Sequence, residues 1–588
     1  MKTTRALFRP RSRVAAWAAA IAVPILLAAC GGGGGEDLTG DLLVRNTHLG
    51  PIKGAVDSAT GTYAWKGIPY AKPPVGTLRW QPPQEPDAWS TARTTTAFGN
   101  ACSQYGRIYG PGANNRYDET IGTTLNQAVG SEDCLYLNVW RPAGVDTNLP
   151  VIVFFHGGSN VSGYTADPMY DGAALAKAAN AIVVTPNFRL GILGFLSVAQ
   201  LKTGDAQTDS GNFTMLDSTK ALQFVRTNAK AFGGNPDNVT IVGQSAGAIN
   251  VWALQTSPLM TSATTKLFHR TMPMSGGISL ATNLPAGSIP TLSPASTYQA
   301  QGAALVQNLL IADGLATDAA SAQAYIASHT NAQIADYLRG KSPAQLFSVL
   351  LTKLALAGLS GSGPIPDGTV VAADPIAAIN AGNYVKVPTL ASNTRDEGKL
   401  FPSFLPLVGG SGNARIVTDA QLFANHFSYK PNAAPQTTVE QWIAASYLPV
   451  NAPTTGFTAR ADQLNKVFFL ASRDNVLNAL KSKQDNVWYY RFDWDEQPAP
   501  WNDIYGAVHV VDLPFLFGNF GPSLFANVWF TDANRPGRQD LSATMMQTVA
   551  AFARTGDPNN LSLGVNWPAW PRTLVWDATP TNKVIHVE

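Results

Sequence analysis

The sequence predicts an α/β fold in which a mostly parallel central sheet carries helices on both faces. Three apolar runs, at residues 150–155, 181–185 and 238–242, are typical of buried strands. Between the second and third runs, residues 218–232 carry apolar side chains at helical spacing. A strand, a helix and a second strand in this order indicate parallel pairing, because the crossover returns the chain to run in the same direction.

Two later segments extend the predicted sheet, and one long segment interrupts it. Further strands are expected at residues 387–391 and 487–492. Residues 257–364 break the alternation with alanine-rich helical stretches, so we expect an inserted helical cap there. After residue 40 the chain has no comparable low-complexity linker and no internal repeat. We therefore expect residues 41–588 to form one domain that contains the cap.

The N-terminus has the pattern of an export signal. Basic residues precede an apolar stretch at residues 14–29, which ends in small residues before Cys30. This pattern resembles bacterial lipoprotein signals, in which cleavage leaves a lipidated cysteine at the new N-terminus. We expect residues 1–29 to be a signal peptide, Cys30 to be lipidated and residues 30–40, which are rich in glycine, to form a flexible tether. A plain signal peptide or a short membrane helix is the alternative, although the apolar stretch is short for a span of about 20 residues.

The expected location is the outer membrane or the cell surface, where the lipid at Cys30 would anchor the chain. An acidic residue directly after the lipidated cysteine tends to hold lipoproteins at the inner membrane, whereas Gly31 occupies that position here. A periplasmic or secreted protein is the alternative location.

The three cysteines agree with export. Lipidation of Cys30 leaves Cys102 and Cys134 as an even pair. In an oxidising compartment we expect this pair to form a disulfide bond. Two buried free thiols are the alternative.

Charge and composition argue against several functional classes. Charged residues make up 14% of the chain and the formal net charge is +2. No strong electrostatic field therefore favours a nucleic acid or an acidic partner. The sequence also contains neither a His-x-x-x-His pair nor the cysteine-rich spacing of a metal site. We expect no nucleic-acid partner, no metal and no cofactor, and the sequence predicts no particular oligomeric state.

A tight turn directly after the third predicted strand carries a candidate nucleophile. Residues 243–247 read Gly-Gln-Ser-Ala-Gly, which places Ser245 between a strand and a helix. Small neighbours allow a turn that lifts the hydroxyl to the end of the sheet, near a helix N-terminus that favours developing negative charge. A structural turn is the alternative, because the five-residue pattern alone also occurs by chance.

Longer motifs resemble those of the type-B carboxylesterase and cholinesterase family over residues 41–588. Residues 232–247 (FGGNPDNVTIVGQSAG) resemble the serine signature of that family, and residues 132–139 (EDCLYLNV) resemble its second signature. Residues 67–83 and 267–277 match two further blocks in the same order. The resemblance implies an α/β-hydrolase fold and the activity of a serine carboxylic-ester hydrolase. It also implies a disulfide between Cys102 and Cys134, the pair that remains when Cys30 is lipidated.

A nucleophilic serine needs a base, and the base needs an orienting acid. His509 lies in a loop that resembles the catalytic histidine loop of the family, and a structural histidine is the alternative. The acid lies in residues 393–398, where local chemistry leaves Asp396 and Glu397 nearly equal. The resemblance aligns Glu397 with the family's acid, so the expected catalytic residues are Ser245, Glu397 and His509.

The expected oxyanion hole consists of backbone amides. Gly158 and Ser159 follow the strand at residues 150–155, and Ala246 follows the nucleophile. The family usually has a third glycine where this chain has Ser159. The donors are backbone N–H groups, so the side chain does not remove them, although it restricts the conformations that the backbone can adopt.

These residues predict hydrolysis of carboxylic esters through an acyl-enzyme intermediate. The substrate is either a small ester or a polymer such as a polyester, a polyurethane or a feruloylated plant wall; amide or carbamate hydrolysis uses the same groups. Gln244 precedes the serine where cholinesterases carry glutamate, and Thr124 stands where an aromatic residue binds choline, so a choline ester is disfavoured. A non-catalytic adhesion protein is the remaining alternative, and the presence of all three catalytic residues opposes it.

Overall fold

The computed structural model describes residues 41–588, and residues 42–588 form one compact unit. The predictions for the signal peptide, for lipidation at Cys30 and for the tether at residues 30–40 concern residues outside this range. Among the described residues, no helix combines the length and the hydropathy that a membrane crossing requires.

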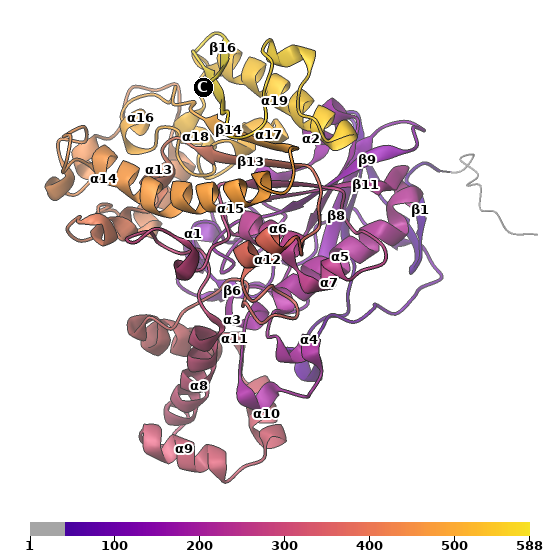
Figure 1. Ribbon diagram of the computed structural model, residues 1–588, viewed down its shortest axis with the longest axis vertical. Coiled ribbons are helices and arrows are strands. Elements are labelled where there is room, and N and C mark those ends of the chain that lie inside the picture. Colours follow the sequence, from indigo (N-terminus) through magenta and orange to yellow (C-terminus); the bar gives the residue numbers. More distant parts are fainter. Residues whose placement is uncertain (1–40) are drawn as a thin grey trace, which may run out of the picture. The chain divides into compact units, whose positions relative to one another are not determined.

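An eleven-stranded sheet dominates the described part of the chain (Figure 1). Its strands, in spatial order, are β16 (Lys583–Val587), β15 (Leu574–Ala578), β14 (Val487–Phe492), β13 (Thr389–Thr394), β12 (Arg270–Met274), β11 (Gly234–Gln244), β9 (Leu149–Phe155), β10 (Ile182–Pro186), β8 (Tyr136–Pro142), β4 (Thr62–Pro69) and β3 (Ala55–Asp57). The strands from β10 to β15 pair in parallel, and antiparallel strands lie at both edges. The predicted mostly parallel sheet is confirmed.

Two small sheets and several short helices complete the connections. The strands are β1 (Val44–Thr47), β2 (Gly50–Lys53), β5 (Arg93–Thr94), β6 (Gln104–Tyr105) and β7 (Ala128–Val129). The helices are α1 (Ile121–Thr124), α3 (Gly191–Gly194), α4 (Ala206–Asp209), α7 (Pro258–Thr261), α13 (Asp419–Ser428), α14 (Phe457–Leu464), α16 (Trp501–Ile504) and α18 (Ala526–Trp529).

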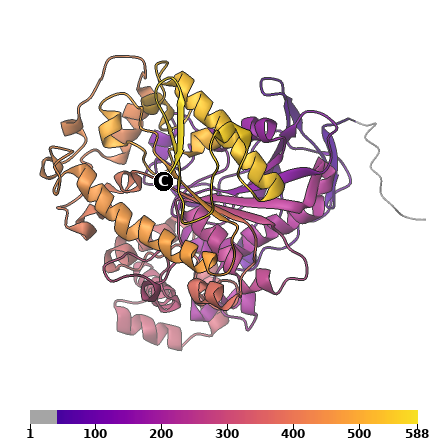
Figure 2. The same ribbon diagram turned by 45° about the horizontal axis from the view of Figure 1, so that its top comes forward.

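Helices cover both faces of the sheet because its central strands are apolar on both sides. In β9, Val151 and Val153 pack into one core, whereas Ile152 and Phe154 pack into the other, as the alternation of strand side chains requires. The first core is covered by α5 (Phe213–Asn228), α6 (Ala246–Thr256), α12 (Pro375–Ala381) and α15 (Ala471–Lys481). The second is covered by α2 (Ala173–Ala179), α17 (Leu513–Phe517) and α19 (Arg535–Thr555), the last of which lies along the sheet in Figure 2.

The structure corrects the boundary of the expected cap. Residues 257–364 include β12 (Arg270–Met274), which pairs in parallel with β11 and β13 in the centre of the sheet. A buried strand of five residues gives little periodic signal beside the alanine-rich stretch that follows it. The helical insertion therefore begins after β12. Its helices lie at the bottom of Figure 1 and are α8 (Ala295–Ala312), α9 (Ala319–Ala327), α10 (Asn331–Arg339) and α11 (Pro343–Val349).

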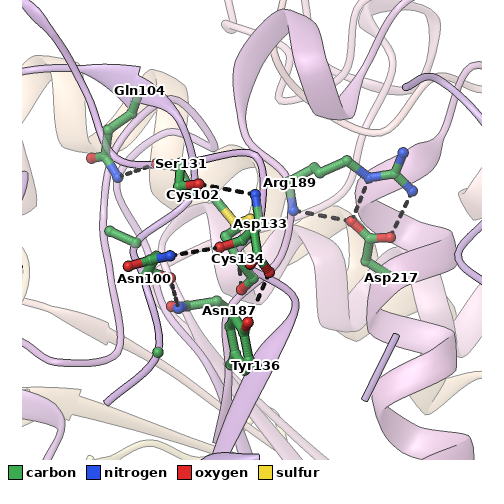
Figure 3. The surroundings of a disulfide bond; sticks show 12 residues. Asn100, Cys102, Gln104, Ser131, Asp133, Cys134, Tyr136, Asn187, Arg189 and Asp217 are labelled. Carbon is green, nitrogen blue, oxygen red and sulfur yellow. Dashed lines mark hydrogen bonds and ion pairs between the residues drawn. A yellow bond between two sulfur atoms is a disulfide. The ribbon is translucent and has the colours of Figure 1, made fainter. Parts of the chain in front are cut away.

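Cys102 and Cys134 form the predicted disulfide bond, which closes a loop that carries β6, α1 and β7 (Figure 3). A polar network holds the base of this loop: Asn100 donates to the carbonyl of Asp133, and Asn187 donates to the carbonyl of Asn100. Cross-linking residues 32 positions apart stabilises the fold by about 4 kcal/mol on the chain-entropy model. The closed loop forms one wall of the cavity described below.

Candidate active site

Ser245 occupies a strained turn at the end of the central strand β11. It has φ +59° and ψ −124°, and α6 begins at the next residue. Its N–H donates to the carbonyl of Met274 on β12 over 2.8 Å. A Cβ atom at Gly243 would clash with the carbonyl of Gly247, and one at Gly247 would clash with the carbonyl of Phe155. The close approach of these backbones explains why both positions beside the serine turn are glycine.

Glu397 and Asp396 follow β13, and the structure separates the two candidate acids. Glu397 is fully buried, and its Oε2 contacts His509 Nδ1. Its Oε1 accepts hydrogen bonds from Asn393 Nδ2 over 3.0 Å and from the N–H of Thr394 over 2.9 Å.

Asp396 is directed elsewhere and ties two loops together. Its Oδ2 accepts hydrogen bonds from Arg395 and from the N–H of Ala507 over 2.9 and 2.8 Å. The N–H of Asp396 in turn donates to the carbonyl of Ala507. Asp396 therefore holds the loop before His509, whereas Glu397 contacts the imidazole itself.

His509 lies in a buried, aromatic environment with one ring edge toward the serine turn. The ring packs against Phe401 and Phe469, with centroids 5.1 and 5.3 Å away. The next residue, Val510, has φ +79°, a conformation that a β-branched residue rarely adopts and that marks strain beside the imidazole.

The imidazole Nε2 of His509 lies 3.1 Å from Gln244 Nε2. This contact was not predicted from the sequence, in which Gln244 stands out only because it lacks the negative charge of the glutamate found in cholinesterases. An amide N–H can donate to Nε2 only when the imidazole proton resides on Nδ1, which is also the tautomer that Glu397 favours. Gln244 directly precedes Ser245, so the imidazole, the amide and the hydroxyl share one end of β11, and all three residues line the same cavity.

Three backbone amides beside Ser245 have no protein acceptor. The N–H groups of Gly158, Ser159 and Ala246 donate to no other group among residues 41–588. Gly158 has φ +101° and Ser159 has φ +55°, so the serine adopts the left-handed conformation that a glycine would take more easily. Ser362 Oγ donates to the carbonyl of Ser159 over 2.9 Å, which helps to hold this conformation.

His156, at the start of the loop that carries Gly158, has a structural environment. Its ring stacks on Phe188 with centroids 4.4 Å apart, and its Nδ1 bonds the carbonyl of Gly157 over 2.8 Å. Burial lowers the pKa of His156 to about 4, so the imidazole is neutral and supports the loop that carries Gly158.

Ser245 lines two cavities, which also share Ser159, Phe401 and Phe404. The first has a volume of about 330 Å³, and we call it the tyrosine cavity; it is lined by Tyr109, Tyr117, Tyr164, Asp167, Tyr170 and His509. The second has a volume of about 300 Å³, and we call it the hydroxyl cavity; it is lined by Ser159, Thr291, Ser293, Tyr298 and Ser362. Within residues 41–588, no three His, Cys, Asp or Glu side chains are placed to hold a metal ion.

A buried carboxyl group, Asp512, lies beneath the site. Burial and the nearby Glu397 charge raise the pKa of Asp512 to about 7. Its Oδ2 accepts a hydrogen bond from Tyr490 over 3.3 Å, and its Oδ1 is buried without a partner among the described residues. The folded state therefore favours the neutral acid.

This shift predicts a pH-dependent stability. The folded-state pKa of Asp512 lies above the unfolded value of about 3.9, so the group stabilises the fold below that value, and the contribution is lost as pH rises toward 7. We expect Asp512→Asn to lack this loss, which amounts to roughly 4 kcal/mol at most between pH 4 and 7. Urea unfolding of both proteins across this range measures it, and a pH-independent difference between their free energies of unfolding contradicts it.

Comparisons with known proteins agree with this site. The family model described as "Carboxylesterase family" matches residues 41–584. The chain is 32% identical over 543 residues to para-nitrobenzyl esterase of Bacillus subtilis, covering 92% of this chain and 95% of that protein. It is 30% identical to cocaine esterase of Homo sapiens, and the match covers 90% of this chain and 85% of that protein. A solved PNB esterase structure superposes with a TM-score of 0.68 at 28% identity, covering 93% and 97% of the two chains. The chain therefore belongs to the carboxylesterase family and is a serine carboxylic-ester hydrolase with the α/β-hydrolase fold.

Proposed function

We propose that Ser245, His509 and Glu397 are the catalytic triad of an esterase that acts on small-molecule esters through an acyl-enzyme. The observation that carries the proposal is the buried contact between Glu397 Oε2 and His509 Nδ1, at a cavity that Ser245 and His509 both line. In this arrangement Glu397 fixes the imidazole proton on Nδ1 and leaves the Nε2 lone pair for the serine proton.

In the first half of the reaction, His509 Nε2 removes the proton from Ser245 Oγ as this oxygen attacks the ester carbonyl. The Gln244 amide, 3.1 Å from Nε2, must give way to the serine hydroxyl at this step. The leaving alcohol then takes the proton from Nε2 and departs, which leaves the acyl group on Ser245. Water repeats the same steps and releases the carboxylic acid.

The free amides of Gly158, Ser159 and Ala246 provide the oxyanion hole in this proposal. Their N–H groups have no protein acceptor among the described residues, so they are available to a negatively charged oxygen. Ala246 begins α6, so the helix N-terminus adds to the stabilisation. Removing one such donor typically costs about 3 kcal/mol of transition-state stabilisation.

The two cavities favour a small ester over a polymer. Ser245 lines both, and their volumes are about 330 and 300 Å³, so each can hold one moderately large substituent of the ester. The predicted polyester and polyurethane substrates need a longer groove, whereas a feruloyl ester presents one aromatic acyl group that these volumes do not disfavour. Amide and carbamate hydrolysis would use the same triad and gain no separate support from these cavities.

We also propose that the protein is exported and anchored by a lipid on Cys30, at the outer membrane or the cell surface. The sequence of residues 1–30 supports this location. The disulfide between Cys102 and Cys134 agrees with it, because such bonds persist in oxidising compartments.

Labelling with a fluorophosphonate ester tests the triad. We expect one phosphonyl adduct on Ser245, identified by mass spectrometry of the proteolytic fragments, because only an activated serine attacks this reagent quickly. As the reagent is titrated, labelling of Ser245 should rise in proportion to the loss of ester hydrolysis. A fully inhibited enzyme that carries the adduct on another residue would refute the assignment.

A further inference from the structure

The tyrosine cavity contains a carboxylate that the proposed mechanism does not use. Asp167 lines this cavity, and within residues 41–588 the only hydrogen bond to its carboxylate is from the N–H of Met169, over 2.9 Å, to Oδ1. No basic side chain of the described residues forms an ion pair with it. Burial raises the pKa of Asp167 to about 6, as expected for a carboxylate taken from water without a cation.

Two unpartnered hydroxyl groups accompany this carboxylate. Tyr117 Oη and Tyr164 Oη are buried and have no hydrogen-bond partner among the described residues, and both side chains line the tyrosine cavity. The charge of Asp167 acts on both phenols and contributes to raising their pKa. Because these two hydroxyl groups line a substrate cavity, a bound ligand can supply the hydrogen-bond partners that the protein does not.

The other charged side chains at this cavity are occupied with one another. Arg107 Nε contacts Asp419 Oδ2 over 3.1 Å, and Arg415 Nη2 contacts Asp419 Oδ1 over 2.5 Å. The Arg107 side chain is half exposed, which places Arg107, Asp419 and Arg415 at the entrance of the cavity. Asp167 therefore remains as the charged group that needs an opposite charge from the substrate.

The proton transfers decide which part of the ester enters this cavity. His509 must deliver a proton to the leaving alcohol, and His509 lines the tyrosine cavity but not the hydroxyl cavity. The alcohol part of the ester therefore lies in the tyrosine cavity, and the acyl part lies in the hydroxyl cavity. This step rests on the proposed function.

We propose that Asp167, Tyr117 and Tyr164 form a subsite for a protonated primary amine on the alcohol part of the substrate. A primary ammonium group has three N–H donors, and the subsite offers three acceptors: one carboxylate and two phenol oxygens. The enzyme is thus selective for esters of amino alcohols.

Matched pairs of esters test this selectivity. The first set contains ω-aminoalkyl butyrates with chains of four to six carbons, and the second contains n-alkyl butyrates in which CH₃ replaces NH₃⁺. We expect kcat/KM to be at least about 10-fold higher for the best amine than for its neutral partner, in the range of a hydrogen bond to a charged group. A trimethylammonium analogue keeps the positive charge but has no N–H, so it is expected to show a smaller preference than the primary amine.

Variants assign the effect to the subsite. Asp167→Asn keeps an oxygen that can accept from Met169 N–H, and it should lower kcat/KM for the amine esters by at least about 10-fold while changing the neutral esters less than about 2-fold. Tyr164→Phe should lower the amine preference by a smaller factor. Asp485→Asn removes a carboxylate that is fully exposed and does not line the tyrosine cavity, so it controls for the loss of one negative charge. It should change kcat/KM for neither the amine esters nor the neutral esters.

The outcomes separate the two proposals. Equal kcat/KM for amine and neutral esters in the wild type, or an equal loss of both in Asp167→Asn, would overturn the amine subsite and leave the triad standing. A trimethylammonium ester with a preference equal to that of the primary amine would also overturn it, because that cation cannot donate to the three acceptors. Failure of the wild type to hydrolyse either set would overturn the proposed function, and the subsite with it.

Discussion

Ser245→Ala is expected to lower kcat for a small ester such as p-nitrophenyl butyrate by at least about 10⁴-fold. The residue stands at φ +59° between β11 and α6, so no other hydroxyl can take its place at the end of the strand. Without the hydroxyl, the oxyanion amides and the cavities remain, but no acyl-enzyme forms. The remaining rate is that of water attacking a bound and polarised ester, which accounts for the residual catalysis of such variants.

The fold of this variant should be unchanged, because the turn is held by the backbone. The N–H of residue 245 donates to Met274, and the flanking glycines are untouched. A matched control is Ser262→Ala, at an exposed serine after α7, which should change kcat less than about 2-fold. A Ser245→Ala variant with wild-type kcat and an unchanged melting temperature would refute the proposed nucleophile.

The sheet could be predicted from the sequence because its central strands are apolar on both faces. Residues 487–492 coincide with β14, and residues 150–155 differ from β9 by one residue. The strand β12 was missed because its five residues carry no helical or alternating pattern that separates them from the insertion. The equally short β10 was predicted because it is rich in β-branched residues, whereas β12 reads Arg-Thr-Met-Pro-Met and includes a proline, which is uncommon within a central strand.

The sequence predicts those parts of the site that lie in one continuous stretch of chain. The serine turn is one stretch of chain, and the resemblance placed Glu397 where local chemistry left Asp396 equal. The contact between Gln244 and His509 joins positions 265 residues apart, and the cluster of Tyr117, Tyr164 and Asp167 joins two loops across a cavity. These residues come together only in the tertiary fold, so their spacing in the sequence does not predict the contacts.

Glu397→Gln is expected to lower kcat by roughly 10³–10⁴-fold while the protein remains folded. The two oxygens of Glu397 have different partners. Oε1 accepts from Asn393 Nδ2 and Thr394 N–H, so in the variant the amide oxygen must occupy this position. The new NH₂ group then faces His509 Nδ1 as a donor. This donor forces the imidazole proton onto Nε2. A protonated Nε2 has no free lone pair, so it cannot accept the proton of Ser245.

Asp396→Asn is the matched control, because it removes the neighbouring carboxylate that local chemistry alone could not exclude. Asp396 Oδ2 bonds Arg395 and Ala507 N–H, and an asparagine oxygen can keep the second of these bonds. We expect kcat to fall less than roughly 5-fold, because Asp396 does not contact the imidazole. The free energy of unfolding should fall by about 3–5 kcal/mol, because the variant loses the ion pairs with Arg395 and with buried Lys399. Steady-state kinetics and urea unfolding of both variants distinguish the roles. A larger loss of kcat in Asp396→Asn than in Glu397→Gln would mean that Asp396 orients the base, since only a group that sets the imidazole tautomer can cost several orders of magnitude.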